Sequence, residues 1–397
     1  MLFQRLRLRV RGAALRAERS STPAVQRKLA ALRGAGSALI RLDPVRGTDL
    51  LLRHLQLALD SGDCVEAGRG LSWQVVGEAF VGSNPARLRA LARQAEALAA
   101  QTGDVETGAM LHFGRGLAGI YEPGALEELA QSIKLFREHA SDAAYYNRAQ
   151  AEMLSALVRV FRGELLQVAR ELPAHIDEAW ARGDLCIVPM WAGAYSQIAR
   201  LAVSDHVGAA RDLARARAAW PDHAFTIQDF SLFQGEMFKA RYEGDTQRAW
   251  DVCERYWIRF RASPLTRVAY VADWVCLHRG EVVALHAAAQ PARARADLLA
   301  IAERMAARKS LAPKLTVPLR AALAAAGGQL DATLDILREG ARSMPTLWAH
   351  AARHRLGCIM GGDEGGRLVR EAETFFGARG VAQPGQLVAA LFPGCEL

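Results

Sequence analysis

The sequence predicts an all-α fold, an α-solenoid of antiparallel helix pairs resembling tetratricopeptide repeats, with a period of about 40 residues. Ala, Leu and Arg dominate the composition, and 45 of the 50 basic residues are Arg. These residues are good helix formers. Turn-forming residues recur along the chain, and the apolar residues between them follow the helical period. Only residues 5–11 alternate polar and apolar side chains, as a strand would.

Two sets of turns alternate along the sequence. The first set is marked by Gly82, Gly124, Gly163, Ser204 and Gly244, at steps of 42, 39, 41 and 40 residues. The second set lies midway, at Gly62-Asp63, Gly103-Asp104, Ser141-Asp142, Gly183-Asp184 and Pro221-Asp222. A Gly in the left-handed conformation ends one helix, and the following Asp caps the next. We therefore expect two helices per unit, which must stack because one pair cannot bury its own apolar face.

The repeat pattern divides the chain into three parts. Residues 1–42 form a basic N-terminal segment with the first helix or helices, and residues 43–280 form the regular array. Its first helix begins at Asp43-Pro44 and carries an apolar stripe of leucines from Leu51 to Leu59. Residues 281–397 hold less regular pairs and a capping tail. In this part we expect helices at 290–308, 311–326, 330–343, 346–359 and 364–379.

The net charge of +8 is concentrated at the N-terminus. Residues 1–33 hold nine basic residues and one acid, so the other 364 residues are balanced. The basic segment has three interpretations: the linker and first helix of a longer parent's array, a contact for anionic lipid or nucleic acid, or a solvated tail. Because the neutral body offers no phosphate contacts, we do not expect nucleic acid as the main partner.

Cysteine usage and hydropathy indicate a cytoplasmic protein. The six cysteines lie far apart without a paired spacing, as expected for buried thiols in a reducing compartment. No stretch approaches the roughly 18 apolar residues of a transmembrane helix. The N-terminus alternates Arg with apolar residues and has no apolar core of a signal peptide.

The nucleotide and kinase motifs favour no catalytic residue and no cofactor. Residues 114–119 match G-x-G-x-x-G, but they fall within a helical stretch, where close helix packing explains the glycines better than a dinucleotide. A phosphate-binding loop requires a Lys directly after a Gly, and no Lys in this sequence follows a Gly. H-R-D and D-F-G are absent. The sequence therefore predicts a protein that is not an enzyme.

Aromatic residues concentrate in one region and suggest a binding face. Residues 220–275 hold 12 of the 28 aromatic side chains. Trp250, Cys253, Trp257 and Phe260 form one helical stripe, and the other side carries Arg248, Arg255 and Arg259, with Tyr256 at the boundary. Guanidinium groups beside a ring suit an acidic or peptide motif. Ordinary packing plus a solvated face is the alternative.

A histidine-rich helix face offers a second kind of site. His350, His354 and Cys358 are spaced i, i+4 and i+8, so they share a face that could present metal ligands. This spacing lacks the general base of an H-E-x-x-H motif. A helical metal-dependent enzyme is therefore an alternative, and a satisfied or partly exposed face remains the simpler interpretation.

Short motifs at both ends resemble a known family. They are GGDEG at 361–365, FFGARGV at 375–381, Pro384, LFPG at 391–394, DPVRGTD at 43–49, RHL at 53–55 and the basic stretch at 5–11. These resemble the C-terminal tetratricopeptide-like region of bacterial serine/threonine protein kinases fused to a signal-transduction ATPase module.

The resemblance implies a sensory or regulatory module whose concave groove receives a protein or peptide, linked to a kinase or ATPase in cis or in trans. It makes Arg46, Asp49, Arg53 and His54 candidate contact residues, although capping is an alternative role for Arg46 and Asp49. A nucleic-acid or membrane adaptor acting through the basic N-terminus is the other alternative function.

Overall fold

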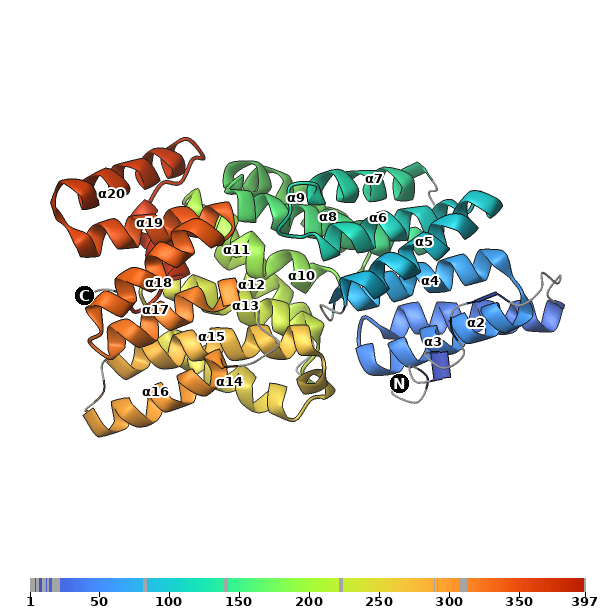
Figure 1. The fold of residues 1–397 in the computed structure, drawn as a ribbon, viewed down its shortest axis with the longest axis horizontal. Helices are drawn as coiled ribbons and strands as arrows, with labels where there is room; N and C mark the ends of the chain where they lie inside the picture. The colour runs from blue at the N-terminus through green and yellow to red at the C-terminus, as the bar shows by residue number, and fades with distance from the viewer. Residues whose placement is uncertain are drawn as a thin grey trace. The chain divides into compact units, whose positions relative to one another are not determined.

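The structure is a computed structural model that describes residues 22–80, 84–138, 142–220, 224–288, 292–307 and 313–395, together with Gln4, Arg7, Leu8, Gly12, Ala14, Leu15 and Gln290. Throughout these residues the regular secondary structure is helical and contains no strand, which confirms the all-α prediction (Figure 1). Contacts divide the chain into two compact units, unit 1 (Met1–Val158) and unit 2 (Arg159–Leu397). None of the described helices is both long enough and apolar enough to cross a bilayer.

Unit 1 consists of helices joined by short turns. They are α2 (Pro23–Leu39), α3 (Pro44–Ser61), α4 (Cys64–Phe80), α5 (Pro85–Thr102), α6 (Val105–Ala118), α7 (Ala125–Glu138) and most of α8 (Asp142–Arg162). Consecutive helices from α2 to α7 contact one another, and α4 also packs on α6. Contact between alternate helices is what a stack of helix pairs requires.

Capping residues determine where the helices of unit 1 begin and end. The Asp43 side chain accepts from Arg46 N at the start of α3, and Asp104 does the same from Thr107 N at the start of α6. Gly62 and Gly103, which end α3 and α5, have φ angles of 73° and 69°. The predicted combination of a left-handed Gly and a capping Asp is confirmed at Gly103-Asp104.

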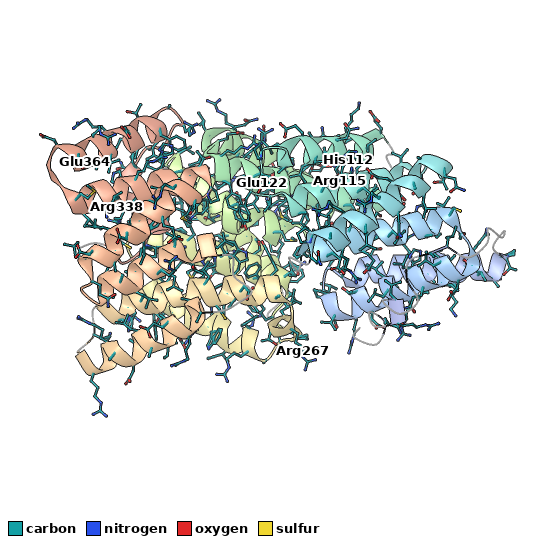
Figure 2. The ribbon with its side chains drawn as sticks, viewed as in Figure 1. His112, Arg115, Glu122, Arg267, Arg338 and Glu364 are labelled. Carbon is teal, nitrogen blue, oxygen red and sulfur yellow. The ribbon has the colours of Figure 1, made fainter. Side chains whose placement is uncertain are left out.

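The core of unit 1 is built from the apolar stripes that the periodicity indicated. Leu51, Leu52, Leu55 and Leu59 of α3 are all buried. They belong to two core clusters: Leu52, Leu55 and Leu59 pack with α4 and α5, and Leu51 packs with α4, α6 and α7. The outer side of α6 is polar: His112 lies 2.7 Å from Glu128, and Arg115 pairs with Glu96 (Figure 2).

The glycines of the G-x-G-x-x-G sequence lie in α6 and serve helix packing. A Cβ on Gly114 would lie 2.8 Å from Val75 Cγ1 of α4, and one on Gly116 would lie 2.6 Å from Leu129 Cγ of α7. Real Cβ atoms do not approach so closely, so these two positions allow α6 to contact both neighbours. The packing interpretation of this motif agrees with the structure.

Unit 2 holds the remaining helices. They are α9 (Leu165–Ala181), α10 (Val188–Ala192), α11 (Ala194–Ala202), α12 (His206–Ala219), α13 (Ile227–Tyr242), α14 (Thr246–Arg261), α15 (Ala269–Ala288), α16 (Ala292–Ala306), α17 (Val317–Ala326), α18 (Leu330–Ser343), α19 (Thr346–Met360), α20 (Gly362–Gly377) and α21 (Pro384–Leu391), with 3-10 turns η1 (Pro264–Arg267) and η2 (Pro313–Thr316). The helices expected beyond residue 290 are present, and the one expected at 330–343 has the same bounds.

The turns of unit 2 repeat the predicted geometry, with one departure. Gly163, Gly183 and Gly244 have φ angles of 81°, 64° and 72°. At the equivalent turn between α11 and α12 the chain has Ser204, with φ 62°, which is the one positive φ of a non-glycine residue in the described ranges. The turn markers Gly82, Ser141, Pro221 and Asp222, and most of the basic segment before residue 22, lie outside the described residues.

The last helix of unit 2 returns to its first helices. Helix α21 contacts α11, α13, α19 and α20, and Ala382 N donates to Ala202 O at the end of α11 over 2.8 Å. Its Leu387, Val388 and Ala390 are fully buried. The tail after α20 therefore packs inside unit 2, where α13 also contacts α10, α11, α12, α14 and α15.

Candidate functional site

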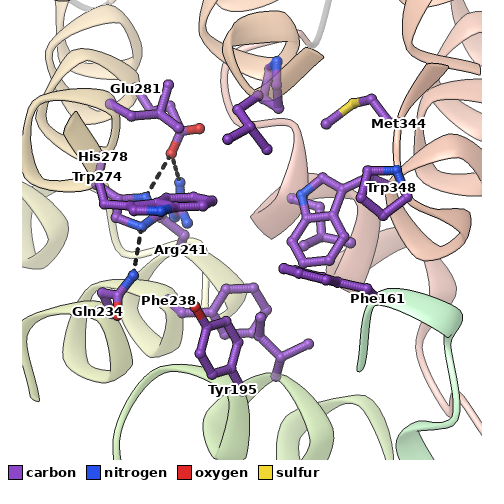
Figure 3. Close-up of a pocket in the computed structure, with 16 residues that line it drawn as sticks. Phe161, Tyr195, Gln234, Phe238, Arg241, Trp274, His278, Glu281, Met344 and Trp348 are labelled. Atoms are coloured by element: carbon purple, nitrogen blue, oxygen red, sulfur yellow. Dashed lines mark hydrogen bonds and ion pairs between the residues drawn. The ribbon is translucent and has the colours of Figure 1, made fainter. Parts of the chain in front are cut away.

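Unit 2 contains a cavity of about 60 Å³ that is lined by side chains from several helices. One water molecule needs about 10–15 Å³, so the space is large enough for a small organic group. Most of the lining is apolar, and Figure 3 shows the aromatic side chains around it. The lining residues are Phe161, Tyr195, Ile198, Gln234, Phe238, Arg241, Trp274, Leu277, His278, Glu281, Leu315, Pro318, Met344, Pro345, Trp348 and Leu391.

Helices α13 and α15 contribute the polar part of the cavity. Gln234, Phe238 and Arg241 are spaced i, i+4 and i+7 on α13, so they share one face. Trp274, His278 and Glu281 follow the same spacing on α15. A capping box at Thr226 and Asp229 fixes the start of α13, and neighbouring helices surround it so that most of its side chains are buried.

The polar groups at the cavity form one connected set (Figure 3). Arg241 Nη1 donates to Glu281 Oε2, and His278 Nδ1 lies 3.2 Å from the same oxygen. His278 Nε2 lies 3.3 Å from the Gln234 amide nitrogen. The NH2 nitrogen of the Gln234 side chain can only donate, so His278 Nε2 is the acceptor. The Nδ1 atom of His278 therefore carries the proton, and Glu281 accepts it in a hydrogen bond. Each charged group at the cavity thus has a partner within the protein.

Burial determines the ionisation of this set. Burial lowers the pKa of His278 below its ordinary value, and hydrogen bonding to Glu281 offsets only part of the shift. Burial alone would raise the pKa of Glu281, but the charge of Arg241 and the hydrogen bond from His278 lower it. The lining therefore carries one positive and one negative charge with a neutral imidazole at neutral pH.

Aromatic rings from different helices meet edge to face at the cavity. The Phe161 ring of α8 lies 5.3 Å from the Trp348 ring of α19, with an interplanar angle of 73°. It lies 6.2 Å from Tyr195 of α11 at 81°. This is the arrangement that the electrostatics of aromatic rings favours.

The structure separates the residues predicted on α14. Arg248 and Arg255 are half exposed, and they pair with Glu243 and Glu236. Tyr256 lies in the core, only 1% exposed, and its hydroxyl donates to Glu236 Oε1 over 2.9 Å. Burial raises the pKa of this hydroxyl. The ring therefore packs between helices and does not line an open face of α14.

Arg259 belongs to a buried ion pair. Its Nη2 lies 2.9 Å from Oδ1 of Asp229, which is fully buried. Arg217 Nη1 lies 3.4 Å from the same oxygen, and Trp220 Nε1 and the Thr226 hydroxyl donate to Oδ2. Arg259 thus connects α14 to the start of α13.

The four residues suggested by the resemblance at α3 do not form one surface. Arg46 is largely exposed and pairs with the capping Asp43, whereas Asp49 pairs with Arg53 at 2.8 Å along the helix. His54 is fully buried, with Nε2 2.7 Å from Glu66 Oε2 of α4. His54 therefore lies away from the face that carries Arg46 and Arg53.

Glu66 links His54 to a charge network in unit 1. Arg33 of α2 lies 3.1 Å from Glu66, and so does Arg69 of α4, which also reaches Asp104 at 2.8 Å. Burial would raise the pKa of Glu66, but the hydrogen bond from His54 and the charges of Arg33 and Arg69 bring it to about 2. This network connects α2, α3, α4 and α6 and so contributes to stability.

The three predicted metal ligands on α19 are held by different neighbours. His350 stacks on Phe375 at 3.7 Å, and burial together with the charge of Arg353 lowers its pKa to about 4. His354 Nδ1 lies 3.6 Å from Cys358 Sγ. Within the described part of the chain, the donor atoms of the three residues do not all come within 4.8 Å of one another.

The sequence drew attention to the region of the cavity but not to the cavity itself. Phe238 and Trp274 belong to the aromatic cluster at 220–275, although the predicted binding face was on α14, between the two helices that carry them. Phe161, Trp348 and Leu391 come from distant parts of unit 2. The sequence around each of these three residues shows no pattern that indicates a shared site.

Comparison with protein-family models, with curated proteins and with solved structures finds no match for this chain. The resemblance of its terminal motifs to kinase–ATPase proteins therefore stays a prediction.

Proposed function

We propose that this chain is a non-catalytic helical-repeat module that recognises a ligand or partner through the unit 2 cavity. The observation that carries the proposal is the cavity itself: a mostly apolar space, lined in part by aromatic rings, whose only charged side chains, among the described residues, pair with each other. Binding sites are typically concave and apolar with a few polar groups that fix orientation. The cavity of unit 2 fits this description.

The internal hydrogen bonds favour recognition over chemistry. A general base needs a free lone pair within reach of a substrate proton. The acceptor nitrogen of His278 is directed at Gln234, and the Oε2 atom of Glu281 is held by Arg241 and His278. A preorganised set of this kind presents fixed dipoles to a guest without reorganisation.

We extend the proposal to bacterial signal transduction on the strength of the terminal motifs. In a serine/threonine kinase–ATPase system, such a module would receive a protein, peptide or small ligand and report its presence to the kinase in cis or in trans. The helix-pair pattern supports this role because stacked pairs serve as scaffolds for recognition. A kinase–ATPase gene beside this one would add support.

The proposal is tested by a ligand screen on the full chain. Small organic compounds and short peptides are screened by thermal shift against the wild type and two variants, Trp348→Leu at the cavity and Trp250→Leu as control. Trp250 is also half buried in unit 2, but it stacks on His286 at 4.2 Å, away from the cavity lining. We expect ligands whose stabilisation is lost only in Trp348→Leu.

Two outcomes contradict the proposal. If no compound distinguishes the two variants, the cavity is not a recognition site. If a bound compound is recovered chemically changed, as read by mass spectrometry, the module is catalytic.

A further inference from the structure

The size of the unit 2 cavity limits its guest to a few atoms. The cavity measures about 60 Å³. A dry cavity of about 150 Å³ holds one benzene ring, and one water molecule needs about 10–15 Å³. On these two scales the space takes a guest of about two to four heavy atoms, such as a short side chain or a very small organic molecule.

One carboxylate oxygen at the cavity is available to such a guest. Arg241 and His278 both contact Oε2 of Glu281, whereas Oε1 takes part in no hydrogen bond with the described residues. The Glu281 side chain is only 5% exposed, yet Oε1 is not fully covered by protein atoms. In Figure 3 this oxygen points away from the two dashed lines, toward the side of the cavity where Trp348 lies. Glu281 therefore offers the cavity one hydrogen-bond acceptor.

Trp348 offers a hydrogen-bond donor to the same space. Within the part of the chain that the structure describes, its indole Nε1 has no acceptor, and this atom is not fully covered either. Figure 3 shows the nitrogen on the edge of the indole that faces Glu281 and His278. An indole N–H donates and cannot accept, and it usually finds a partner when it lies inside a protein. The cavity thus presents one acceptor and one donor that the fold leaves unpaired.

These two groups determine which guests are favourable. A guest that displaces water without reproducing its hydrogen bonds loses affinity, so the guest must pair with both groups. A hydroxyl group and a primary carboxamide each donate and accept. Because Arg241 and Glu281 neutralise each other, a charged guest would lose its hydration without gaining an unpaired counter-charge. The rest of the lining is mostly apolar, so the remaining atoms of the guest gain from being apolar as well.

We infer that the cavity binds a small uncharged group that both donates and accepts a hydrogen bond, a primary carboxamide or a hydroxyl on a few carbon atoms, an inference that rests on the proposed function. The group accepts from Nε1 of Trp348 and donates to Oε1 of Glu281, and its carbon atoms pack on the apolar lining. Free small molecules and the side chains of Asn or Thr in a peptide share this chemistry.

The test is an NMR titration of the full chain at pH 7 with four probes that share one four-atom skeleton: acetamide, 2-propanol, acetone and acetate. We expect acetamide and 2-propanol to shift the indole N–H signal of Trp348 until it saturates, while the signal of Trp250 stays in place. Acetone accepts but cannot donate, so it should bind about tenfold more weakly than acetamide, because Oε1 of Glu281 is left unpaired. Acetate carries a charge and should also bind more weakly.

A matched pair of variants locates the binding. Trp348→Phe keeps a ring at the cavity but removes the N–H, and it should weaken acetamide about tenfold, measured by saturation transfer to the probe. Trp250→Phe makes the same change away from the lining and should leave the affinity unchanged. Circular dichroism verifies that each variant is folded. The ratio of acetamide to acetone affinity is measured on the wild type, so it tests the inference even if Trp348→Phe does not fold.

A fifth probe, N-acetylasparaginamide, separates the two sources of the guest. If it binds as well as acetamide, a peptide side chain is the source, and if it does not bind while acetamide does, the source is a small molecule.

The outcomes separate the guest class from the proposed function. Acetone that binds as tightly as acetamide, or acetate that binds more tightly, overturns the inferred class but leaves a cavity that binds ligands. Acetamide affinity that is unchanged in Trp348→Phe overturns the assigned site. If no probe binds, the class is overturned, while the compound screen with Trp348→Leu still decides the proposed function.

Discussion

Replacing Ser204 with Gly is expected to stabilise unit 2. Ser204 has φ 62° at the turn between α11 and α12, where the equivalent turns at Gly163 and Gly244 have φ 81° and 72°. The left-handed region brings the Cβ of an L-residue close to a carbonyl oxygen. Ser204 is exposed, so removal of its side chain costs no buried contact.

The magnitude follows from two opposing effects. The left-handed conformation costs a residue with a Cβ about 1–2 kcal/mol. Glycine loses more backbone entropy on folding, by about 0.5–1 kcal/mol. Ser204→Gly should therefore raise the free energy of unfolding by about 0.5–1 kcal/mol, the difference between these terms.

Urea unfolding followed by circular dichroism measures the effect. With a slope of about 2–3 kcal/mol/M, the midpoint of the unit 2 transition should rise by about 0.2–0.5 M. Gly244→Ala is the matched control, because no heavy atom lies within 4 Å of the Cβ position at Gly244 and the cost is only that of the backbone. It should lower the midpoint by a similar amount. A lower midpoint for Ser204→Gly, or an unchanged one for Gly244→Ala, would refute the reasoning.

Three further predictions concern helix packing and buried charge. Gly116→Ala should destabilise unit 1 by about 1–3 kcal/mol through overlap with Leu129, whereas Gly108→Ala on the same helix should stabilise it by up to about 1 kcal/mol, both by thermal unfolding. Because the pKa of Glu66 is lowered from 4.5 to about 2, its contribution, on the order of 3 kcal/mol, is present above pH 4.5 and lost as the pH falls toward 2, read by urea unfolding across pH. Asp229→Asn should cost unit 2 about 3–5 kcal/mol in urea unfolding, because it removes the charge of the fully buried carboxylate that pairs with Arg217 and Arg259.

Each of these predictions has a result that contradicts it. Equal effects of the two glycine substitutions would mean that the approach of α6 to α7 is not tight. For the pH series, Glu66→Gln should flatten the slope between pH 4.5 and 2, and an unaltered slope would assign it to other carboxyl groups. If Asp229→Asn has the same urea midpoint as the wild type, the prediction is wrong, and solvent stabilises Arg217 and Arg259 in place of the carboxylate.

Local signals predicted the helices well because they act over a few residues. Asp43 and Asp104 each accept a hydrogen bond from the backbone N–H three residues further along, at the start of a helix, and the left-handed Gly103 ends the helix before Asp104. The apolar stripe of α3 is buried as its period indicated. Even the strained Ser204 could be located, since the repeat spacing placed it where other turns have Gly.

The sequence predicted less well which side chains of a helix are buried by its neighbours. On α14, the periodicity gave Trp250 and Trp257 to the core stripe and left Tyr256 at its boundary, but the buried residues include Tyr256 and exclude both tryptophans. The tryptophans are partly covered by His286 and by Arg279, which lies 4.6 Å from the Trp257 ring. A helical wheel shows which residues share a face, but how far each face is buried depends on how α13 and α15 pack against it.

The cavity depends on contacts between residues far apart in sequence, and this is why it escaped prediction. Phe161 and Leu391 lie at opposite ends of unit 2 and become neighbours because α21 packs on α11 and α13. A repeating pattern predicts contacts between successive pairs, and a stack of pairs leaves its inner face open to a helix or an extended peptide. In unit 2 the chain's own α21 packs on α11, α13, α19 and α20, and its Leu391 contributes to the lining of the cavity.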